Sequence, residues 1–360
     1  MTNNKTVESF ARRLLDWYEG NGRKDLPWQT DPTPYRVWVS EIMLQQTQVG
    51  TVIPYFNIFV RRFPDVVTLA AATSDQVLQL WSGLGYYARG RNLHAAARLV
   101  VEQHDGELPE SLDQLIQLPG IGRSTAGAIM ALAHGRRCAI LDGNVKRVLA
   151  RYHQIEGWPG TSEVLKKLWA LSEQHLPKED CIRKYTQAIM DLGATICRRR
   201  PDCVACPLVV GCLANANGRQ LAVPERKPTG ERKERDVFML IARLPDGSVY
   251  LERRPDKGIW GGLWSFPEIE MASDASEWCQ TTLSCRVENS RPLEQVKHSL
   301  THFEMNIRPI LLNVVPNGVA DRIMDDGQKV WYNGDASQPL GIAAPVSLLI
   351  QKYAISGEIQ

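Results

Sequence analysis

Two different hydrophobic patterns divide the chain. Up to about residue 215, apolar residues recur at spacings of three and four, which predicts helices almost throughout. Residues 216–235 contain little apolar content, two prolines and dense mixed charge, a composition typical of a linker. Beyond them, short apolar runs predict strands, and the last run predicts a helix: 236–243, 248–254, 308–315 and 329–333, then 344–354. The pattern predicts a multidomain protein with an all-α domain (1–215), a linker (216–235) and a smaller α+β domain (236–360).

Length and composition support this division. At 360 residues the chain is long enough for two domains with separate cores. No apolar run approaches the roughly 18 residues that span a bilayer, and the N-terminus lacks the apolar core of a signal peptide. We therefore expect a soluble, cytoplasmic protein that acts as a monomer and does not bind membranes. The net charge is only +2, so a polyanionic partner must be held by local features.

Four cysteines form the pattern C-x5-C-x2-C-x5-C: Cys197, Cys203, Cys206 and Cys212. In a chain without a secretory signal, thiols this close in sequence are more often metal ligands than disulfides. Four sulfur ligands suit either structural zinc or an iron–sulfur cluster. The cysteine spacing alone leaves these two alternatives equally open.

The segment LPGIGRSTAGAIMALAHG predicts a tight turn between two helices. Gly120 and Gly122 permit the turn, and Ser124 or Thr125 is expected to cap the second helix. A helix, a Pro-Gly-Ile-Gly turn and a second helix resemble the helix-hairpin-helix motif. In that motif, backbone N–H groups at a helix start bind DNA phosphate without reading base sequence. The alternative is an ordinary helical turn with no ligand.

Two acidic residues are candidates for catalysis. Glu41 lies in the apolar run VWVSEIML, in a helix expected to begin at Thr33 and Pro34 and to end near Gly50. Burial raises the pKa of a carboxyl group, and a group protonated near neutral pH can act as a general acid. Asp142 directly precedes a predicted helix, where the helix N–H groups would hold its side chain rigid and ionised. The alternatives are an exposed Glu41 and an Asp142 that only caps the helix.

Aromatic and basic residues follow a Gly-Leu-Gly turn at 83–85. Tyr86, Tyr87, Arg89 and Arg91 could stack on bases and hold phosphates. By themselves they are more typical of a packed helix start.

Taken together, these segments resemble the helix-hairpin-helix DNA glycosylase superfamily whose members carry a C-terminal iron–sulfur loop. Within it, they are most similar to the MutY family of adenine DNA glycosylases. The resemblance covers about residues 8–215 at high density and continues more weakly beyond. It rests on these segments and on the four cysteines: SEIMLQQTQV, GLGYYARGRNLH, LPGIGRSTAGAI, ILDGNVKRVLAR and QAIMDLGATIC. The resemblance implies that the cysteines hold a [4Fe-4S] cluster.

The resemblance also implies roles for individual residues. Glu41 would protonate adenine, and Asp142 would stabilise the oxocarbenium ion, a two-carboxylate logic shared with glycoside cleavage. The adenine must first be extruded from the duplex. The remaining positions are implied to contact DNA: Gln46 and Tyr86 wedge into the duplex, Trp28 and Gln187 line the adenine pocket, Asn144 assists near Asp142, and Gly120, Gly122 and Ser124 belong to the hairpin motif.

Ser124 separates two kinds of glycosylase. Related glycosylase/lyases of the endonuclease III type carry a lysine at this position, which forms a Schiff base with deoxyribose. Because serine cannot do so, we expect a monofunctional enzyme. Lys146 is a nearby amine able to give weak lyase activity. A glycosylase/lyase for oxidised pyrimidines is the alternative that Ser124 and the C-terminal domain disfavour.

The C-terminal domain resembles a Nudix fold through GIWGGLWSFPEIE. Gly262 and Glu268 match the start of the Nudix box, but residues 276–281 read SEWCQT where an acidic cluster should hold magnesium. We therefore expect binding rather than hydrolysis, which disfavours a nucleotide pyrophosphohydrolase. In the MutY family this domain recognises 8-oxoguanine opposite adenine, and Thr301 and His302 occupy the positions of the recognition loop.

The expected activity is excision of adenine mispaired with 8-oxoguanine or guanine in duplex DNA. Two departures from the family qualify the resemblance. The first cysteine interval, CRRRPDC, is one residue shorter than usual, and Leu300 replaces an aromatic residue beside Thr301. A non-catalytic, DNA-binding iron–sulfur protein, in which both carboxylates are structural, is the alternative from another class.

Overall fold

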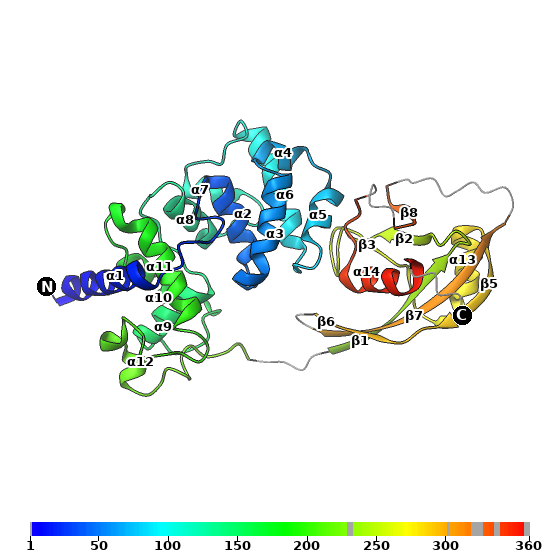
Figure 1. The fold of residues 1–360 in the computed structure, drawn as a ribbon. Helices are drawn as coiled ribbons and strands as arrows, with labels where there is room; N and C mark the ends of the chain where they lie inside the picture. Colours follow the sequence, from blue (N-terminus) through cyan, green and yellow to red (C-terminus); the bar gives the residue numbers. More distant parts are fainter. Residues whose placement is uncertain (1, 229–232, 301–302, 318–326, 335–338, 356–360) are drawn as a thin grey trace. The chain divides into compact units, whose positions relative to one another are not determined.

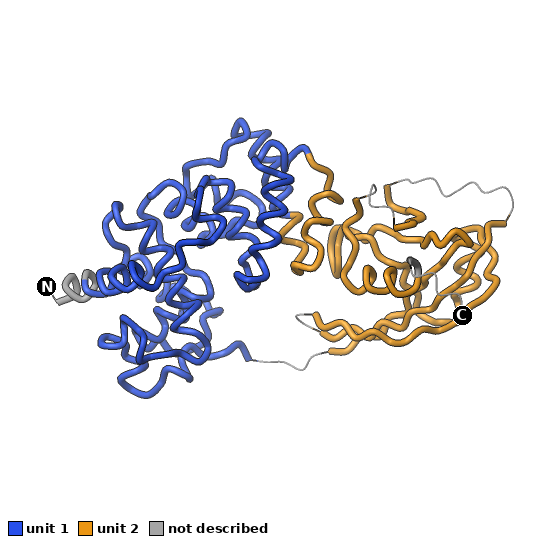
Figure 2. The backbone as a smooth tube through the Cα atoms, viewed as in Figure 1, with its two compact units in different colours: residues 1–71, 92–229 blue, residues 72–91, 230–360 orange. Residues whose placement is uncertain are grey.

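The computed structural model describes residues 2–228, 233–300, 303–317, 327–334 and 339–355. Its residues group into two compact units, which Figure 2 shows in blue and orange. The first contains Met1–Ala71 and Asn92–Thr229, and the second contains Ala72–Arg91 and Gly230–Gln360. Thr301 and His302 lie outside the described residues. Within those residues, no helix is long and apolar enough to cross a membrane.

The part of the chain before the linker is helical, as its periodicity predicts (Figure 1). The helices are α1 (Thr2–Asn21), α2 (Pro34–Leu44), α3 (Val49–Arg62), α4 (Val66–Ala71), α5 (Ser74–Trp81), α6 (Ala88–Gln103), α7 (Leu112–Gln117), α8 (Arg123–Leu132), α9 (Gly143–Tyr152), α10 (Ser162–Gln174), α11 (Ile182–Thr195) and α12 (Leu213–Ala216). A buried cluster joins α1, α8, α9, α10 and α11, with Phe10, Leu149, Leu168 and Leu192 fully buried. This cluster holds the helices on which the candidate site is built.

Two predicted helix boundaries were wrong. The helix expected to end near Gly50 ends at Leu44, because Gln45 leaves the helical conformation and Gln46 has a left-handed backbone (φ 59°). Gly50 instead lies in the first turn of α3. Neither Ser124 nor Thr125 caps α8, since Gly122 occupies the N-cap position. The start of α2 was correct: Thr33 is the N-cap, and its hydroxyl accepts the N–H of Arg36.

The second unit contains a mixed sheet in the order β3-β2-β1-β7-β5. The long strands β1 (Lys233–Arg243) and β7 (Phe303–Pro316) pair in parallel at its centre. The other strands are β2 (Val249–Arg253), β3 (Trp264–Ser265), β4 (Glu268–Ile269), β5 (Cys285–Pro292), β6 (Val296–Ser299) and β8 (Lys329–Tyr332), and the helices are α13 (Ala275–Leu283) and α14 (Ala344–Ile350). Helix α13 packs on the sheet through Ala275, Cys279 and Leu283 (Figure 1). The α+β character and the four predicted strand runs are confirmed.

Residues 72–91 belong to the second unit although they lie far from it in sequence. The indole Nε1 of Trp264 donates to Asp75 at 3.0 Å, and the Arg91 guanidinium donates to the carbonyl of Gly261. The domain boundaries at 215 and 235 stay a prediction.

Candidate functional site

Helix α2 places Glu41 in a crowded environment. Its neighbours in the sequence, Ser40 and Ile42, are almost fully buried, whereas Glu41 itself keeps some accessible surface. Burial of the carboxyl group, with a smaller contribution from the negative charge of Asp142, raises the pKa of Glu41 to about 8. A carboxyl group with this pKa is mostly protonated at neutral pH, as predicted for a general acid.

Asp142 is the N-cap of α9, as the sequence predicted. One carboxylate oxygen accepts the N–H of Val145 at 2.8 Å, and the other accepts Nδ2 of Asn144 at 3.1 Å. These bonds favour the ionised form, but burial outweighs them and raises the pKa of Asp142 above its ordinary value. The sequence predicted the helix-start contacts that favour the ionised form, but not the burial that opposes them. The carboxylate is nevertheless held at both oxygens.

Arg147 connects this carboxylate to the cysteine loop. Its guanidinium donates to Oδ1 of Asn144 at 2.9 Å, to the carbonyl of Gly193 at 2.6 Å and to the carbonyl of Cys197 at 2.7 Å. The same Asn144 side chain donates to Asp142. A single side chain thus spans α9, α11 and the first cysteine of the predicted metal loop.

The turn between α7 and α8 has the close backbone geometry expected of the hairpin motif. Gly120 has φ +79°, and a Cβ there would lie only 2.8 Å from Cβ of Asn92. A Cβ at Gly122 would meet nothing within 4 Å, so the start of α8 has open space in front of it. Ser124 points inward, because its hydroxyl accepts the N–H of Leu141 at 2.9 Å.

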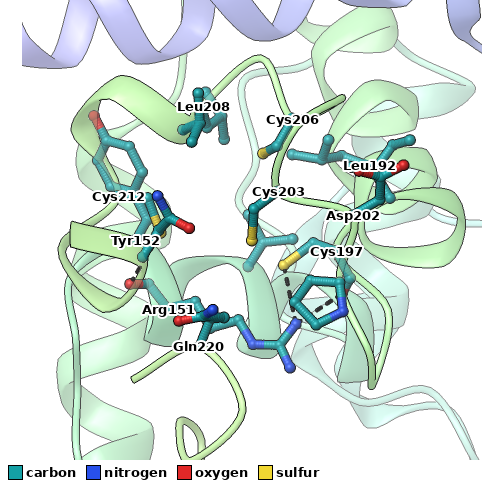
Figure 3. A pocket seen from close by; sticks show the side chains of 15 residues that line it. Arg151, Tyr152, Leu192, Cys197, Asp202, Cys203, Cys206, Leu208, Cys212 and Gln220 are labelled. Carbon is teal, nitrogen blue, oxygen red and sulfur yellow. Dashed lines mark hydrogen bonds between the residues drawn. The ribbon is translucent and has the colours of Figure 1, made fainter. Parts of the chain in front are cut away.

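The four predicted metal ligands line one pocket (Figure 3). Its other walls include Val148, Tyr152, Leu192 and Leu208. Burial raises the pKa of Cys206 to about 12 and raises the pKa of Cys203 and Cys212.

The thiols of Cys203, Cys206 and Cys212 therefore favour the neutral form until a cation stabilises their thiolates. Among the described residues, no three His, Cys, Asp or Glu side chains meet as a site for a single ion. Arg151 donates to Sγ of Cys197 at 3.3 Å, the kind of contact that surrounds cluster sulfurs. The shared pocket and the four thiols fit a cluster held by this loop.

A partly buried ion pair between Arg23 and Asp191 fixes Gln187. Asp191 is fully buried, and Nε of Arg23 at 2.9 Å and Nη2 at 2.6 Å bind one of its oxygens. Nε2 of Gln187 donates to the same oxygen at 2.9 Å, which fixes the orientation of the amide and leaves its oxygen as an acceptor for a ligand. Trp28, the other residue that the family resemblance implies for the adenine pocket, is buried and packs edge-on against Phe56.

Of the four aromatic and basic residues after the Gly-Leu-Gly turn (Tyr86, Tyr87, Arg89 and Arg91), Tyr86 is the exposed one, at 45%. Tyr86 has a left-handed backbone (φ 49°). Arg89 is buried, donates to the carbonyls of Leu84 and Gly85, and lies over the ring of Trp81. The packed helix start is therefore the correct interpretation for Arg89 and for the buried Tyr87.

In the Nudix-like unit, Glu268 is paired with Arg254 and, at 3.7 Å, with Arg235. Helix α13 stands where a Nudix box would place its acidic helix, and its sequence is ASEWCQTTL. Glu277 is its single acidic residue. The expectation that this unit binds its ligand rather than hydrolysing it stays a prediction.

Known proteins resemble both units. Residues 39–174 match the HhH-GPD superfamily of base excision DNA repair proteins, and residues 238–352 match the NUDIX domain. The adenine DNA glycosylase of Buchnera aphidicola subsp. Baizongia pistaciae is 37% identical over 348 residues, which cover 96% of this chain and 97% of that protein. This chain belongs to the adenine DNA glycosylase family. It is thus a DNA N-glycosylase, a hydrolase of base excision repair.

A second relative supports the family, and a solved structure supports the fold. The adenine DNA glycosylase of Homo sapiens is 36% identical over 366 residues, covering 83% of this chain and 66% of the human protein. The solved structure of a thermostable thymine-DNA glycosylase is 27% identical, with a TM-score of 0.55, and covers 60% of this chain and 100% of its own. The helical glycosylase fold predicted from the sequence is confirmed.

Sequence reasoning missed three supporting residues: Arg147, Asp191 and Ser172. Asp191 could have been found, because it stands in the apolar segment QAIMDLGA just as Glu41 stands in its own. Arg147 and Ser172 carry no such signal, since a basic residue or a serine in a helix is ordinary.

Proposed function

We propose that this adenine DNA glycosylase removes adenine paired with 8-oxoguanine or guanine, and that it leaves an abasic site without cutting the strand. The observation that carries the proposal is the buried carboxyl group of Glu41, whose pKa is raised to about 8 chiefly by burial and to a smaller extent by the negative charge of Asp142. One carboxyl group can donate a proton while the other can stabilise positive charge.

In the proposed reaction, the protonated Glu41 transfers its proton to a ring nitrogen of the extruded adenine. The bond between adenine and C1′ then breaks, and its electron pair leaves with the neutral base. Asp142, held by Val145 and Asn144, stabilises the oxocarbenium ion electrostatically. Water adds at C1′ and returns a proton to Glu41, which completes hydrolysis.

We assign base recognition to Gln187 and Trp28, and duplex distortion to Gln46 and Tyr86. Asp191 orients the Gln187 amide so that its oxygen is available as an acceptor for the exocyclic amine of adenine. Both proposed wedge residues have left-handed backbones (φ 59° and 49°). Strained conformations of non-glycine residues occur preferentially at functional sites, which supports this assignment.

Ser124 supports monofunctional chemistry. Its hydroxyl is engaged with the N–H of Leu141, and it offers no amine that could attack C1′. Lys146, in the first turn of α9, is the amine to test for residual lyase activity. For phosphate contact we assign Gly120, Gly122 and the N–H groups at the start of α8.

We assign a [4Fe-4S] cluster to Cys197, Cys203, Cys206 and Cys212. When bound, the cluster supplies a fixed centre for the basic loop that contains Arg198, Arg199 and Arg200. The Nudix-like unit is assigned to recognition of 8-oxoguanine, with Thr301 and His302 as the proposed contacts. Hydrolysis of nucleotides is not proposed, because α13 lacks the acidic cluster.

The decisive experiment is single-turnover incubation with a duplex that carries one 8-oxoguanine:adenine pair, with the adenine strand labelled. Breakage only after hot alkali is the expected result, and breakage without alkali would contradict monofunctional action. The Glu41→Gln variant should bind the duplex and fail to release adenine. A 8-oxoguanine:cytosine duplex serves as the substrate control, and equal adenine release from adenine:thymine pairs would contradict the proposed mispair specificity.

A further inference from the structure

The segment before Asp142 is held from two sides. Residues 139–141 are not helical, and they lead directly into the N-cap of α9. Ile140 and Leu141 are both 3% exposed. A buried, non-helical backbone needs partners for its polar groups outside a regular ladder, and the position of Asp142 depends on where those partners hold it.

Two serine hydroxyls from different helices supply these partners. Ser172 in α10 is buried and donates to the carbonyl of Ile140 at 2.7 Å. Ser124 in α8 accepts the N–H of Leu141 at 2.9 Å. The two bonds act on adjacent residues, immediately before the catalytic candidate.

Gly127 completes the arrangement one turn further along α8. A Cβ at this position would lie 2.2 Å from the carbonyl oxygen of Ala139, a distance that real side chains do not tolerate. The backbone of the segment therefore rests directly on α8. Small residues at 124, 127 and 172 thus fix three consecutive residues, 139 to 141.

We propose that Ser124 and Ser172 are positioning residues that set the location of the Asp142 carboxylate. This inference rests on the proposed function, in which Asp142 stabilises the oxocarbenium ion. Electrostatic stabilisation depends on a pre-arranged geometry, and a displacement of about 1 Å can lower a rate roughly 100-fold. Loss of either serine bond leaves a buried backbone group unpaired, which the segment can relieve only by shifting.

The test compares Ser124→Ala, Ser172→Ala and Asp142→Asn in the full-length, cluster-containing protein. Ser124→Ala lies in the first turn of α8, where alanine is well accommodated, so this variant should fold even if Ser172→Ala does not. Ser124→Thr keeps an acceptor oxygen and serves as the rescue variant. The matched control is Thr195→Val, which removes a 2.8 Å side-chain bond to the carbonyl of Asp191 inside α11.

Three quantities are measured: the single-turnover excision rate across pH, the Kd for an 8-oxoguanine:adenine duplex with a non-cleavable adenine analogue, and the melting temperature. Each serine-to-alanine variant should excise about tenfold more slowly, with Kd changed less than threefold. The acid limb of the pH–rate profile should move to higher pH in these variants. The reason is that an Asp142 carboxylate displaced from Val145 and Asn144 loses the hydrogen bonds that favour its ionised form. Ser124→Thr should recover most of the rate, and Thr195→Val should change neither rate nor limb.

The outcomes separate the two proposals. If Asp142→Asn excises adenine normally, the role of Asp142 fails and this inference fails with it. If Asp142→Asn is inactive while both alanine variants stay within twofold of the parent rate at every pH, the positioning role alone is overturned. A lower melting temperature with an unchanged rate and limb would likewise reduce the two serines to structural residues.

Discussion

Replacement of Glu41 by glutamine should make the protein more stable, and increasingly so as pH rises. The pKa of Glu41 is raised to about 8, from an ordinary 4.5, chiefly because its carboxyl group is buried. Between these values the folded protein retains a proton that the unfolded chain has released. Stability therefore falls as pH increases through this range. Glutamine has nearly the same shape and carries no titratable proton, so the stability of the variant does not fall with pH for this reason.

The size of the stability difference between the parent and Glu41→Gln follows from the pH interval between the ordinary and the raised pKa of Glu41. Each pH unit within it costs the parent about 1.4 kcal/mol relative to Glu41→Gln, and the difference stops growing above the folded pKa. From 4.5 to pH 7 the difference reaches on the order of 3 kcal/mol. The carboxyl group of Glu41 thus reduces stability at the pH where the proposed function needs it as an acid.

The assay is thermal unfolding of the parent and Glu41→Gln at pH 5, 6, 7, 8 and about 9, with the cluster intact. The melting temperatures should be similar at pH 5 and diverge up to about pH 8. Glu163→Gln is the matched control, because Glu163 is fully exposed and is paired with Lys167 at 2.6 Å. A constant difference across pH, or a parent that is more stable than Glu41→Gln at pH 8, would refute the reasoning.

Three further perturbations test other parts of the structure. Cys206→Ser should lower the iron content and visible absorbance of the purified protein and reduce its melting temperature, and unchanged iron would contradict the assigned ligand set. Asp191→Asn should cost about 3 kcal/mol in urea unfolding, because it leaves the guanidinium of Arg23 without its buried counter-charge; a loss below about 0.5 kcal/mol would show that the pair is dispensable. Burial, together with the nearby His153, lowers the pKa of His175 to about 4. The free energy of unfolding should therefore decrease as pH falls from about 6.5 towards 4, and His175→Phe should remove most of this pH dependence. The same acid slope in His175→Phe would place its origin elsewhere.

Residues with a local sequence signal could be proposed from the sequence alone, and their functional roles stay predictions. Glu41 stands out because it is an acid in an apolar run, and its pKa is raised by burial as that position suggests. Asp142 stands out because it precedes a helix, and it is the N-cap of α9, but its burial was not predicted. The cysteine spacing similarly predicted one shared pocket. Each of these inferences needed only a few neighbouring residues.

The supporting contacts could not be predicted in this way. Ser172 binds Ile140 across 32 residues, and Asp191 binds Arg23 across 168. Such contacts depend on how helices pack, which hydrophobic periodicity does not specify. The end of α2 was missed for a related reason: Gln46 adopts a left-handed backbone that its residue type does not favour, so no turn signal marks it.

One side chain is both the cap of α9 and the proposed stabiliser of the transition state, and this coupling has a consequence for mutation in a cell. Asparagine caps a helix about as well as aspartate does, so an Asp142→Asn protein should accumulate normally. It would still occupy mispairs, but without releasing the base. Most other replacements would weaken the start of the helix and lower the amount of protein as well. A folded, inactive glycosylase that shields lesions from other repair should therefore be more harmful than the absence of the protein.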